Sequence, residues 1–248
     1  MKAFAADLHI HTALSPCADD GMTPPEIAVA AIEAGLDLIA VCDHNSAGNA
    51  AAVQQVARGP GHGMLTVIAG IEIATREEVH LLALFSDAPV AEEVARAIRG
   101  TLPEVRGAKR RVGRQWLLEY DGARLGEEPR MLSLASSFSL EEAVALVHLA
   151  GGLAIAAHVD RPAFSVMSQL GFLPGNVPFD ALEISAAGVD AGKQQAFAAH
   201  GFPLLTSSDA HYIHDIGKAR TRMHMNAPTF EEVAKCLRGD GGRRCTFA

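Results

Sequence analysis

The chain has 248 residues, a formal net charge of −8, 49% hydrophobic residues and 5% aromatic residues. The acidic balance argues against a general nucleic-acid-binding protein, although a local basic patch can still hold a phosphorylated ligand. The few aromatic residues predict a core of Ala, Val, Leu and Ile, which suits packed α/β layers. The four cysteines are widely spaced, which argues against a structural zinc knuckle and a disulfide framework. No segment has the pattern of a signal peptide or a membrane span, so we expect a soluble cytoplasmic protein.

Apolar runs of strand length alternate with helical patterns along most of the chain. The strand-like runs lie at 3–6, 37–42, 64–74, 78–85, 153–157, 181–185, 203–207 and 221–225. Helical patterns lie at 24–35, 48–58, 90–99, 140–150 and 230–237. Nearly continuous apolar strands in this rhythm predict a parallel or mixed sheet that is covered on its faces.

The segment from about residue 100 to 139 departs from this rhythm. Two short apolar runs, 115–118 and 124–125, flank Asp121-Gly122, a pair that favours a β-hairpin. We interpret the segment as an insertion within one domain that spans residues 1–248. It also carries a basic run that is either a solvated face or a surface for the tail of a phosphorylated ligand, and its members are Arg106, Lys109, Arg110, Arg111 and Arg114.

Metal-capable side chains fall at the ends of the predicted strands. His9 and His11 share one face of a strand and can bind one ion together, although such a pair is often idle when it stands alone. The further residues of this kind are His44, Glu72, His80, His158, Asp209 and His211. The carboxyl ends of sequential parallel strands share one face, so these side chains should converge there. Histidines mixed with carboxylates suit zinc, manganese or iron.

Six motifs occur in a characteristic order along the chain. They are D-L-H-I-H-T at 7–12, C-D-H-N at 42–45, G-I-E-I at 70–73, V-H-L-L-A-L-F at 79–85, A-A-H-V-D-R-P at 156–162 and S-S-D-A-H at 207–211. Together they resemble the polymerase and histidinol phosphatase (PHP) superfamily of metallophosphoesterases, from residue 4 to about 212. The resemblance implies a distorted seven-stranded (β/α) barrel that binds two or three divalent ions through nine ligands. Carried over to this sequence, those ligands are His9, His11, Asp19, His44, Glu72, His80, His158, Asp209 and His211.

The resemblance also implies how the ligands are shared. His9, His11, Glu72 and Asp209 hold one ion, Asp19 and His80 hold a second ion through the shared Glu72, and His44, His158 and His211 hold a third. One ligand is expected in the loop at residues 15–22, which follows the first predicted strand. Counting back from Thr23-Pro24 favours Asp19 as that ligand, whereas counting back from Gly21 favours Asp20. Cys42 stands where the family more often has threonine, and we interpret it as a packing residue.

The resemblance implies hydrolysis by a metal-activated water, with Asp19, Asp43 and Arg161 as further catalytic residues. Asp43 is expected to orient a histidine, because ligating histidines usually have such acceptors behind them. Arg161 is either a bidentate phosphate clamp or a member of an ordinary surface salt bridge.

The function that the sequence favours is a metal-dependent phosphoesterase that acts on a small phosphorylated molecule, for example a nucleotide. One alternative is an exonuclease on nucleic acid ends, which the net charge and the single tryptophan disfavour. Histidinol phosphate is another substrate of this class. An alternative of a different class is a non-catalytic partner or sensor that a metal stabilises. The sequence predicts no membrane partner and leaves the oligomeric state open.

Overall fold

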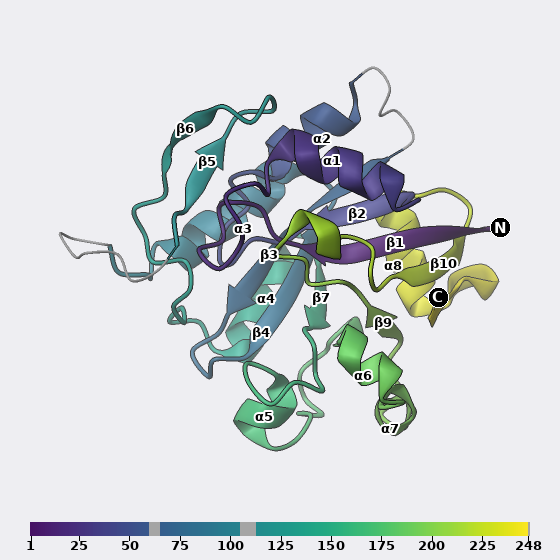
Figure 1. Ribbon diagram of the computed structural model, residues 1–248. Helices are drawn as coiled ribbons and strands as arrows, with labels where there is room; N and C mark the ends of the chain where they lie inside the picture. Colours follow the sequence, from purple (N-terminus) through teal and green to yellow (C-terminus); the bar gives the residue numbers. More distant parts are fainter. Residues whose placement is uncertain (60–64, 105–112, 248) are drawn as a thin grey trace.

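The computed structural model describes residues 1–59, 65–104 and 113–247 (Figure 1). Its strands are β1 (Lys2–Ile10), β2 (Leu38–Val41), β3 (Thr66–Ala74), β4 (His80–Phe85), β5 (Trp116–Leu118), β6 (Arg124–Glu127), β7 (Leu153–Ala156), β8 (Ala181–Ile184), β9 (Leu204–Thr206), β10 (Thr221–Met225) and β11 (Arg244–Phe247). Its α-helices are α1 (Pro24–Glu33), α2 (Ala50–Ala57), α3 (Ala88–Arg99), α4 (Leu140–Leu149), α5 (Val166–Leu170), α6 (Ala186–Asp190), α7 (Gln194–Ala198) and α8 (Phe230–Arg238).

The main sheet has the strand order β11-β10-β1-β2-β3-β4-β7-β8-β9 and is bent into a nearly closed barrel. Neighbouring strands from β1 to β9 are parallel, except that β4 is antiparallel to both β3 and β7. The segment after β9 returns to β1, where Ile10 and Ala210 form a parallel bridge and His11 N donates to Ala210 O at 3.0 Å. The expected seven-stranded α/β barrel is therefore present as the ring β1-β2-β3-β4-β7-β8-β9.

The sheet contains nine strands because β10 and β11 extend it beyond that ring. β10 pairs antiparallel with residues 2–6 of β1, and β11 pairs antiparallel with β10. The Thr221 hydroxyl of β10 also donates to Thr206 O of β9 at 2.8 Å. These two strands thus fill the part of the β1 edge that the segment after β9 leaves open.

Alternate residues of each strand pack into two separate apolar clusters. In β2, Leu38 and Ala40 belong to the cluster inside the barrel, whereas Ile39 and Val41 face the helices outside. Cys42 continues the inner set and is fully buried, which supports its interpretation as a packing residue. A Cβ placed on Gly70 would lie 2.5 Å from the Cys42 sulfur, so this contact requires glycine.

The hairpin predicted around Asp121-Gly122 is formed by β5 and β6, which pair antiparallel in a sheet of their own. It lies beside the barrel, next to the ends of β1 and β2 (Figure 1). Of the basic run, Arg106, Lys109, Arg110 and Arg111 lie outside the described residues. Among the described helices, none has the length and apolar character needed to cross a lipid bilayer.

Candidate metal centre

The predicted site residues gather at one end of the barrel. His9 and His11 stand at the end of β1 and are fully buried, and Glu72 is a buried residue of β3. His80 is the first residue of β4, and because β4 runs antiparallel its beginning lies at the same end of the barrel. The remaining residues follow β2, β7 and β9, and they are His44, His158, Asp209 and His211.

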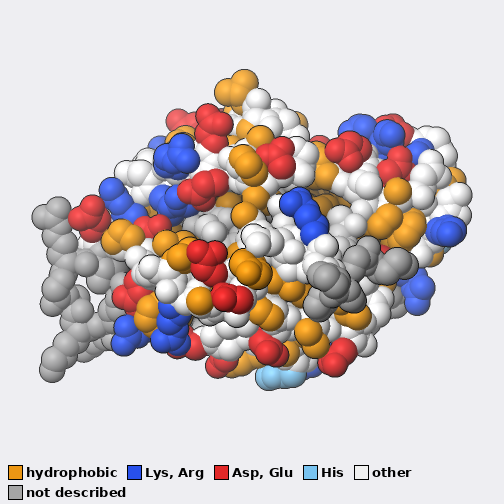
Figure 2. Space-filling view, turned by 90° about the horizontal axis from the view of Figure 1, so that it is seen from above, with side chains coloured by type: hydrophobic (Ala, Val, Ile, Leu, Met, Phe, Trp, Pro, Cys, Tyr) orange, Lys and Arg blue, Asp and Glu red, His pale blue; other side chains and the backbone are white. Residues whose placement is uncertain are grey.

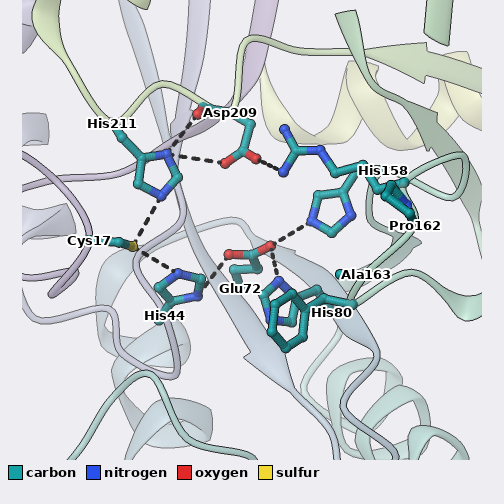
Figure 3. A pocket seen from close by; sticks show the side chains of 11 residues that line it. Cys17, His44, Glu72, His80, His158, Pro162, Ala163, Asp209 and His211 are labelled. Atoms are coloured by element: carbon teal, nitrogen blue, oxygen red, sulfur yellow. Dashed lines mark hydrogen bonds and ion pairs between the residues drawn. The ribbon is translucent and has the colours of Figure 1, made fainter. Parts of the chain in front are cut away.

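These residues surround a pocket of about 410 Å³ (Figure 3). Its lining includes Glu72, Asp209 and four of the histidines on one side, and Pro162, Ala163 and Phe164 on the other. The Phe164 ring stacks on the His80 ring with centroids 4.8 Å apart. The pocket thus combines an apolar wall with a wall of groups that can bind cations.

Four side chains from three strand ends bring their donor atoms to nearly equal distances. His9 Nε2 lies 3.2 Å from His11 Nε2 and 3.3 Å from Asp209 Oδ1, and His11 Nε2 lies 3.1 Å from the same oxygen. The Glu72 carboxylate oxygens lie 3.5 Å from His9 Nε2 and 3.4 Å from His11 Nε2. Donors at the corners of a tetrahedron with bonds of about 2.0–2.1 Å would stand about 3.3 Å apart. The spacing of the His9, His11 and Asp209 donors therefore fits one divalent cation, with one Glu72 oxygen facing each histidine.

Glu72 also faces three further histidines. His80 Nδ1 lies 2.7 Å and His158 Nε2 3.2 Å from its Oε1, while His44 Nδ1 lies 2.8 Å from its Oε2. Burial alone would raise the pKa of Glu72, but the charges on His80, His44 and His9 hold the pKa well below its usual range. An ionised carboxylate between two sets of histidines can bridge two cations.

The ring nitrogens that face away from this centre have their own partners. His9 Nδ1 lies 3.1 Å from Glu183 Oε2, and His11 Nδ1 lies 2.8 Å from Ser15 Oγ. The Ser15 hydroxyl donates to Asp43 Oδ1 at 2.7 Å, so it accepts from the His11 Nδ1–H. Both histidines are thereby held in the tautomer whose Nε2 lone pair points at the centre.

Two protein-family models match this chain. The model of the PHP domain matches residues 7–169, and the model of a PHP-associated region matches residues 194–240. The chain belongs to the PHP domain family. This confirms the resemblance seen in the motifs and places the chain in a family of metal-dependent hydrolases. A comparison with curated proteins finds no match.

Solved structures share the fold at low sequence identity. The lesion-specific endonuclease Q of Pyrococcus furiosus is 22% identical with a TM-score of 0.73, and the match covers 98% of this chain. Endonuclease Q has also been solved with a 27-mer duplex that carries an abasic lesion, and that structure is 21% identical with a TM-score of 0.72. This chain spans 58% of the length of both endonuclease chains. A candidate metal-dependent phosphoesterase from Bifidobacterium adolescentis is 19% identical with a TM-score of 0.56, and the match covers 94% of this chain and 96% of that one.

The PHP ligand set carried over from the motifs is brought together with one exception. Seven of the expected residues lie around the eighth, Glu72, but Asp19 does not. The Asp19 side chain is exposed and accepts from Gly21 N at 2.8 Å within its own turn. Asp20 is also exposed, and it pairs with Arg124 at 3.4 Å. Neither carboxylate lines the pocket in this structure, so a ligand role for either of them stays a prediction.

Cys17, which the sequence analysis did not single out, lines the pocket from the same loop. Its sulfur lies 3.2 Å from His44 Nε2 and 3.1 Å from His211 Nε2 (Figure 3). Burial raises the pKa of the thiol, but hydrogen bonding with His211 and His44 outweighs burial and lowers that pKa from 9.0 to about 7. Glu183 was also missed, although a carboxylate inside the apolar run 181–184 is a signal that a buried charge has a partner.

The other two expected catalytic residues contact the centre in different ways. Asp43 is buried and accepts from Thr12 N, Thr12 Oγ1 and Ser15 Oγ, all at 2.7 Å. Its carboxylate therefore orients His11 through Ser15, and its backbone oxygen accepts from Glu72 N at 3.0 Å. Arg161 lines the pocket and its Nη1 lies 2.5 Å from Asp209 Oδ2. Asp209 also faces His9 and His11, and these charges hold its pKa below the usual range against the effect of burial.

Three residues at this end of the barrel have left-handed backbone conformations that non-glycine residues seldom adopt. They are Asn45 (φ 50°), His158 (φ 29°) and Asp209 (φ 52°). Such conformations cost of order 1–3 kcal/mol each and persist where surrounding contacts enforce them. His158 and Asp209 line the pocket, so their strained turns hold ligand-capable side chains there, whereas the Asn45 amide donates to Leu132 O and Leu134 O.

Proposed function

We propose that this PHP domain hydrolyses the phosphoester of a small phosphorylated molecule, for example a nucleotide, at the pocket around Glu72. The observation that carries the proposal is the group of three donors formed by His9, His11 and Asp209, with spacing that fits a divalent cation and with the Glu72 carboxylate beside it. Those residues would hold one ion, and His44, His80, His158 and His211 would hold one or two more through the shared Glu72. When bound, zinc, manganese or iron ions supply an activated water and offset charge on the phosphoryl oxygens.

The donor chemistry supports a cation at this place. His158 Nδ1 is buried and has no hydrogen-bond partner among the described residues. His9 Nε2 and His11 Nε2 face each other at 3.2 Å although both present lone pairs. A positive ion relieves both of these unfavourable arrangements.

Arg161 is the proposed phosphate-binding side chain. One of its nitrogens contacts Asp209, and its side chain remains 41% exposed at the pocket. The remaining N–H groups of a guanidinium can donate in pairs to phosphate oxygens. The partner of Arg161 is a ligand candidate whose side chain is 7% exposed, so the ion pair also holds Asp209 in place, unlike an ordinary surface salt bridge.

A small substrate is supported by the charges around the pocket. Among the described residues that line it, Arg161 is the sole lysine or arginine. On the face seen in Figure 2, basic and acidic side chains of the described residues are interspersed and form no continuous basic stripe. Binding a long nucleic acid relies on many phosphate contacts from basic residues.

A second candidate is cleavage of DNA, and the specific observation that favours it is the fold match to the lesion-specific endonuclease at a TM-score of 0.73. A duplex with an abasic lesion is bound by that enzyme. This chain spans 58% of the endonuclease, so the match leaves the remaining part of that enzyme uncompared.

The test is a phosphate-release screen with Mn²⁺ or Zn²⁺ over nucleotides, histidinol phosphate, other phosphorylated metabolites and labelled oligonucleotides, including a duplex with an abasic site. We expect a small substrate to be hydrolysed fastest, and His9→Ala or Asp209→Ala to lower the rate by about 10²-fold or more. His200→Ala, which changes an exposed histidine away from the pocket, is the matched control. Faster cleavage of DNA would favour the second candidate. Metal binding without hydrolysis of any ester would favour a sensor.

A further inference from the structure

Cys17 lies between two imidazole rings that come from distant parts of the chain. The cysteine belongs to the loop after β1, His44 follows β2, and His211 follows β9. Its sulfur is 3.2 Å from His44 Nε2 and 3.1 Å from His211 Nε2, and all three residues line the pocket (Figure 3). Three soft or borderline donors from three loops therefore meet at one point.

The outer nitrogens of both rings face acceptors. His211 Nδ1 lies 2.8 Å from the backbone oxygen of Asp209, so Nδ1 carries the proton and donates it. His44 Nδ1 lies 2.8 Å from Glu72 Oε2, a carboxylate oxygen. Each ring consequently presents its Nε2 lone pair to the Cys17 sulfur, in the carboxylate- or carbonyl-backed arrangement typical of metal-ligating histidines.

A thiol cannot satisfy both lone pairs, because it has one proton and two imidazole nitrogens face it. The same loop supplies no competing carboxylate, since Asp19 and Asp20 are both turned to solvent. Independent of the sulfur, His44 and His211 place ligand atoms within 4.8 Å of each other, close enough for a shared ion. A cation is the group that would accept all of these donors at once.

We propose that Cys17 binds, as a thiolate, the ion that His44 and His211 hold, so that the loop after β1 contributes this cysteine and not Asp19, which the resemblance assigned to the ion of His80 and Glu72. This inference rests on the proposed metal centre and adds a ligand to it. On binding, the thiol proton is released to solvent and a sulfur–metal bond forms. A Cys-His-His set favours zinc or another thiophilic ion, whereas the set of His9, His11, Glu72 and Asp209 also suits manganese. The two positions should therefore differ in the metal they prefer.

The first test replaces the native ions with Co²⁺, because cobalt bound to a thiolate has an intense near-ultraviolet charge-transfer band. We expect this band in the intact chain, its loss in Cys17→Ser, and a fall of about one ion in the bound metal. Cys17→Asp should restore the ion without the band and shift the preference from zinc towards manganese. Cys245→Ser, which changes a partly buried cysteine outside the pocket, should keep the band.

The second test uses the exposure of Cys17 in the metal-free chain. Iodoacetamide labelling, followed residue by residue by mass spectrometry, should be slowed at least ten-fold by Zn²⁺ at Cys17 and unchanged at Cys245. A cobalt-loaded chain without the band, or equal labelling with and without zinc, would overturn the role of Cys17 while leaving the metal centre standing. A chain that binds no metal at all would overturn the proposed function as well.

Discussion

At the scale of single residues, the side chains behind the histidines matter as much as the histidines. Glu183 is buried in β8, where its Oε2 lies 3.1 Å from His9 Nδ1 and accepts from His158 N at 3.1 Å. It therefore sets the direction of the His9 ring and the turn that carries His158. A residue in this position acts on the metal through the ligand.

We predict that Glu183→Gln weakens metal binding by about 10–100-fold, because a neutral amide supports the His9 tautomer less strongly than a carboxylate. Calorimetric titration of the metal-free chain with Zn²⁺ or Mn²⁺ measures the change. Glu232→Gln makes the same chemical change at a glutamate that pairs with Arg243 away from the centre, and it should leave the metal affinity unaltered. Equal weakening in both variants would point to a general loss of structure.

At the scale of elements, one buried amide links the β5–β6 hairpin to two loops of the barrel, in addition to the backbone bond from Trp116 N to Ala13 O. Asn49 Nδ2 donates to Trp116 O and to Thr12 Oγ1, both at 2.9 Å, and Asn49 Oδ1 accepts from Leu118 N at 2.9 Å. Thr12 belongs to the loop that follows His11, and its hydroxyl donates to Asp43. The hairpin is thereby joined to the loop that also carries Cys17.

We predict that Asn49→Ala lowers the free energy of unfolding by about 2–4 kcal/mol, since it leaves buried hydrogen-bonding groups of Trp116 and Leu118 without partners. Limited proteolysis should then cut the hairpin faster than the rest of the described chain. Asn176→Ala, at an exposed asparagine, is the control. Unchanged cleavage of the hairpin would show that other contacts are sufficient to hold it.

The sequence was informative where burial decides the structure. The ring strands were predictable because they are short, nearly continuous apolar runs, and the histidines at their ends could be assigned to one face. β11 was missed because Arg244–Phe247 is a short, polar run that looks like a tail, and its pairing with β10 determines it. The position of Cys17 at the pocket, with Asp19 turned to solvent, was not predictable, because the conformation of that loop depends on distant partners such as Asp43 and His211.

At the scale of the whole molecule, the centre joins strand ends that are far apart in the sequence, so a bound metal should stabilise the complete barrel. Only the folded chain brings His9, His11 and Asp209 to within 3.3 Å of one another, and binding to the folded state alone adds about 3–4 kcal/mol at 100 to 1,000 times the dissociation constant.

We therefore predict that chelation lowers the melting temperature and that added Zn²⁺ or Mn²⁺ restores it, as measured by scanning calorimetry. Asp209→Ala should melt at a temperature that responds little to metal. If the melting temperature of the wild-type chain did not change with metal, the prediction that the metal centre stabilises the whole barrel would be wrong.

The closure of the barrel limits how the two parts of such a chain can be recombined between genes. The region matched by the PHP domain model contains His9, His11 and Glu72, whereas Asp209 and His211 come from the region matched by the PHP-associated model. The second region also supplies β10, which pairs with β1. Although two profiles describe the chain, the two regions cannot be exchanged between genes as independent modules. A recombinant that replaced residues 194–240 would need an aspartate and a histidine at the same spacing, followed by a strand that fits the free edge of β1.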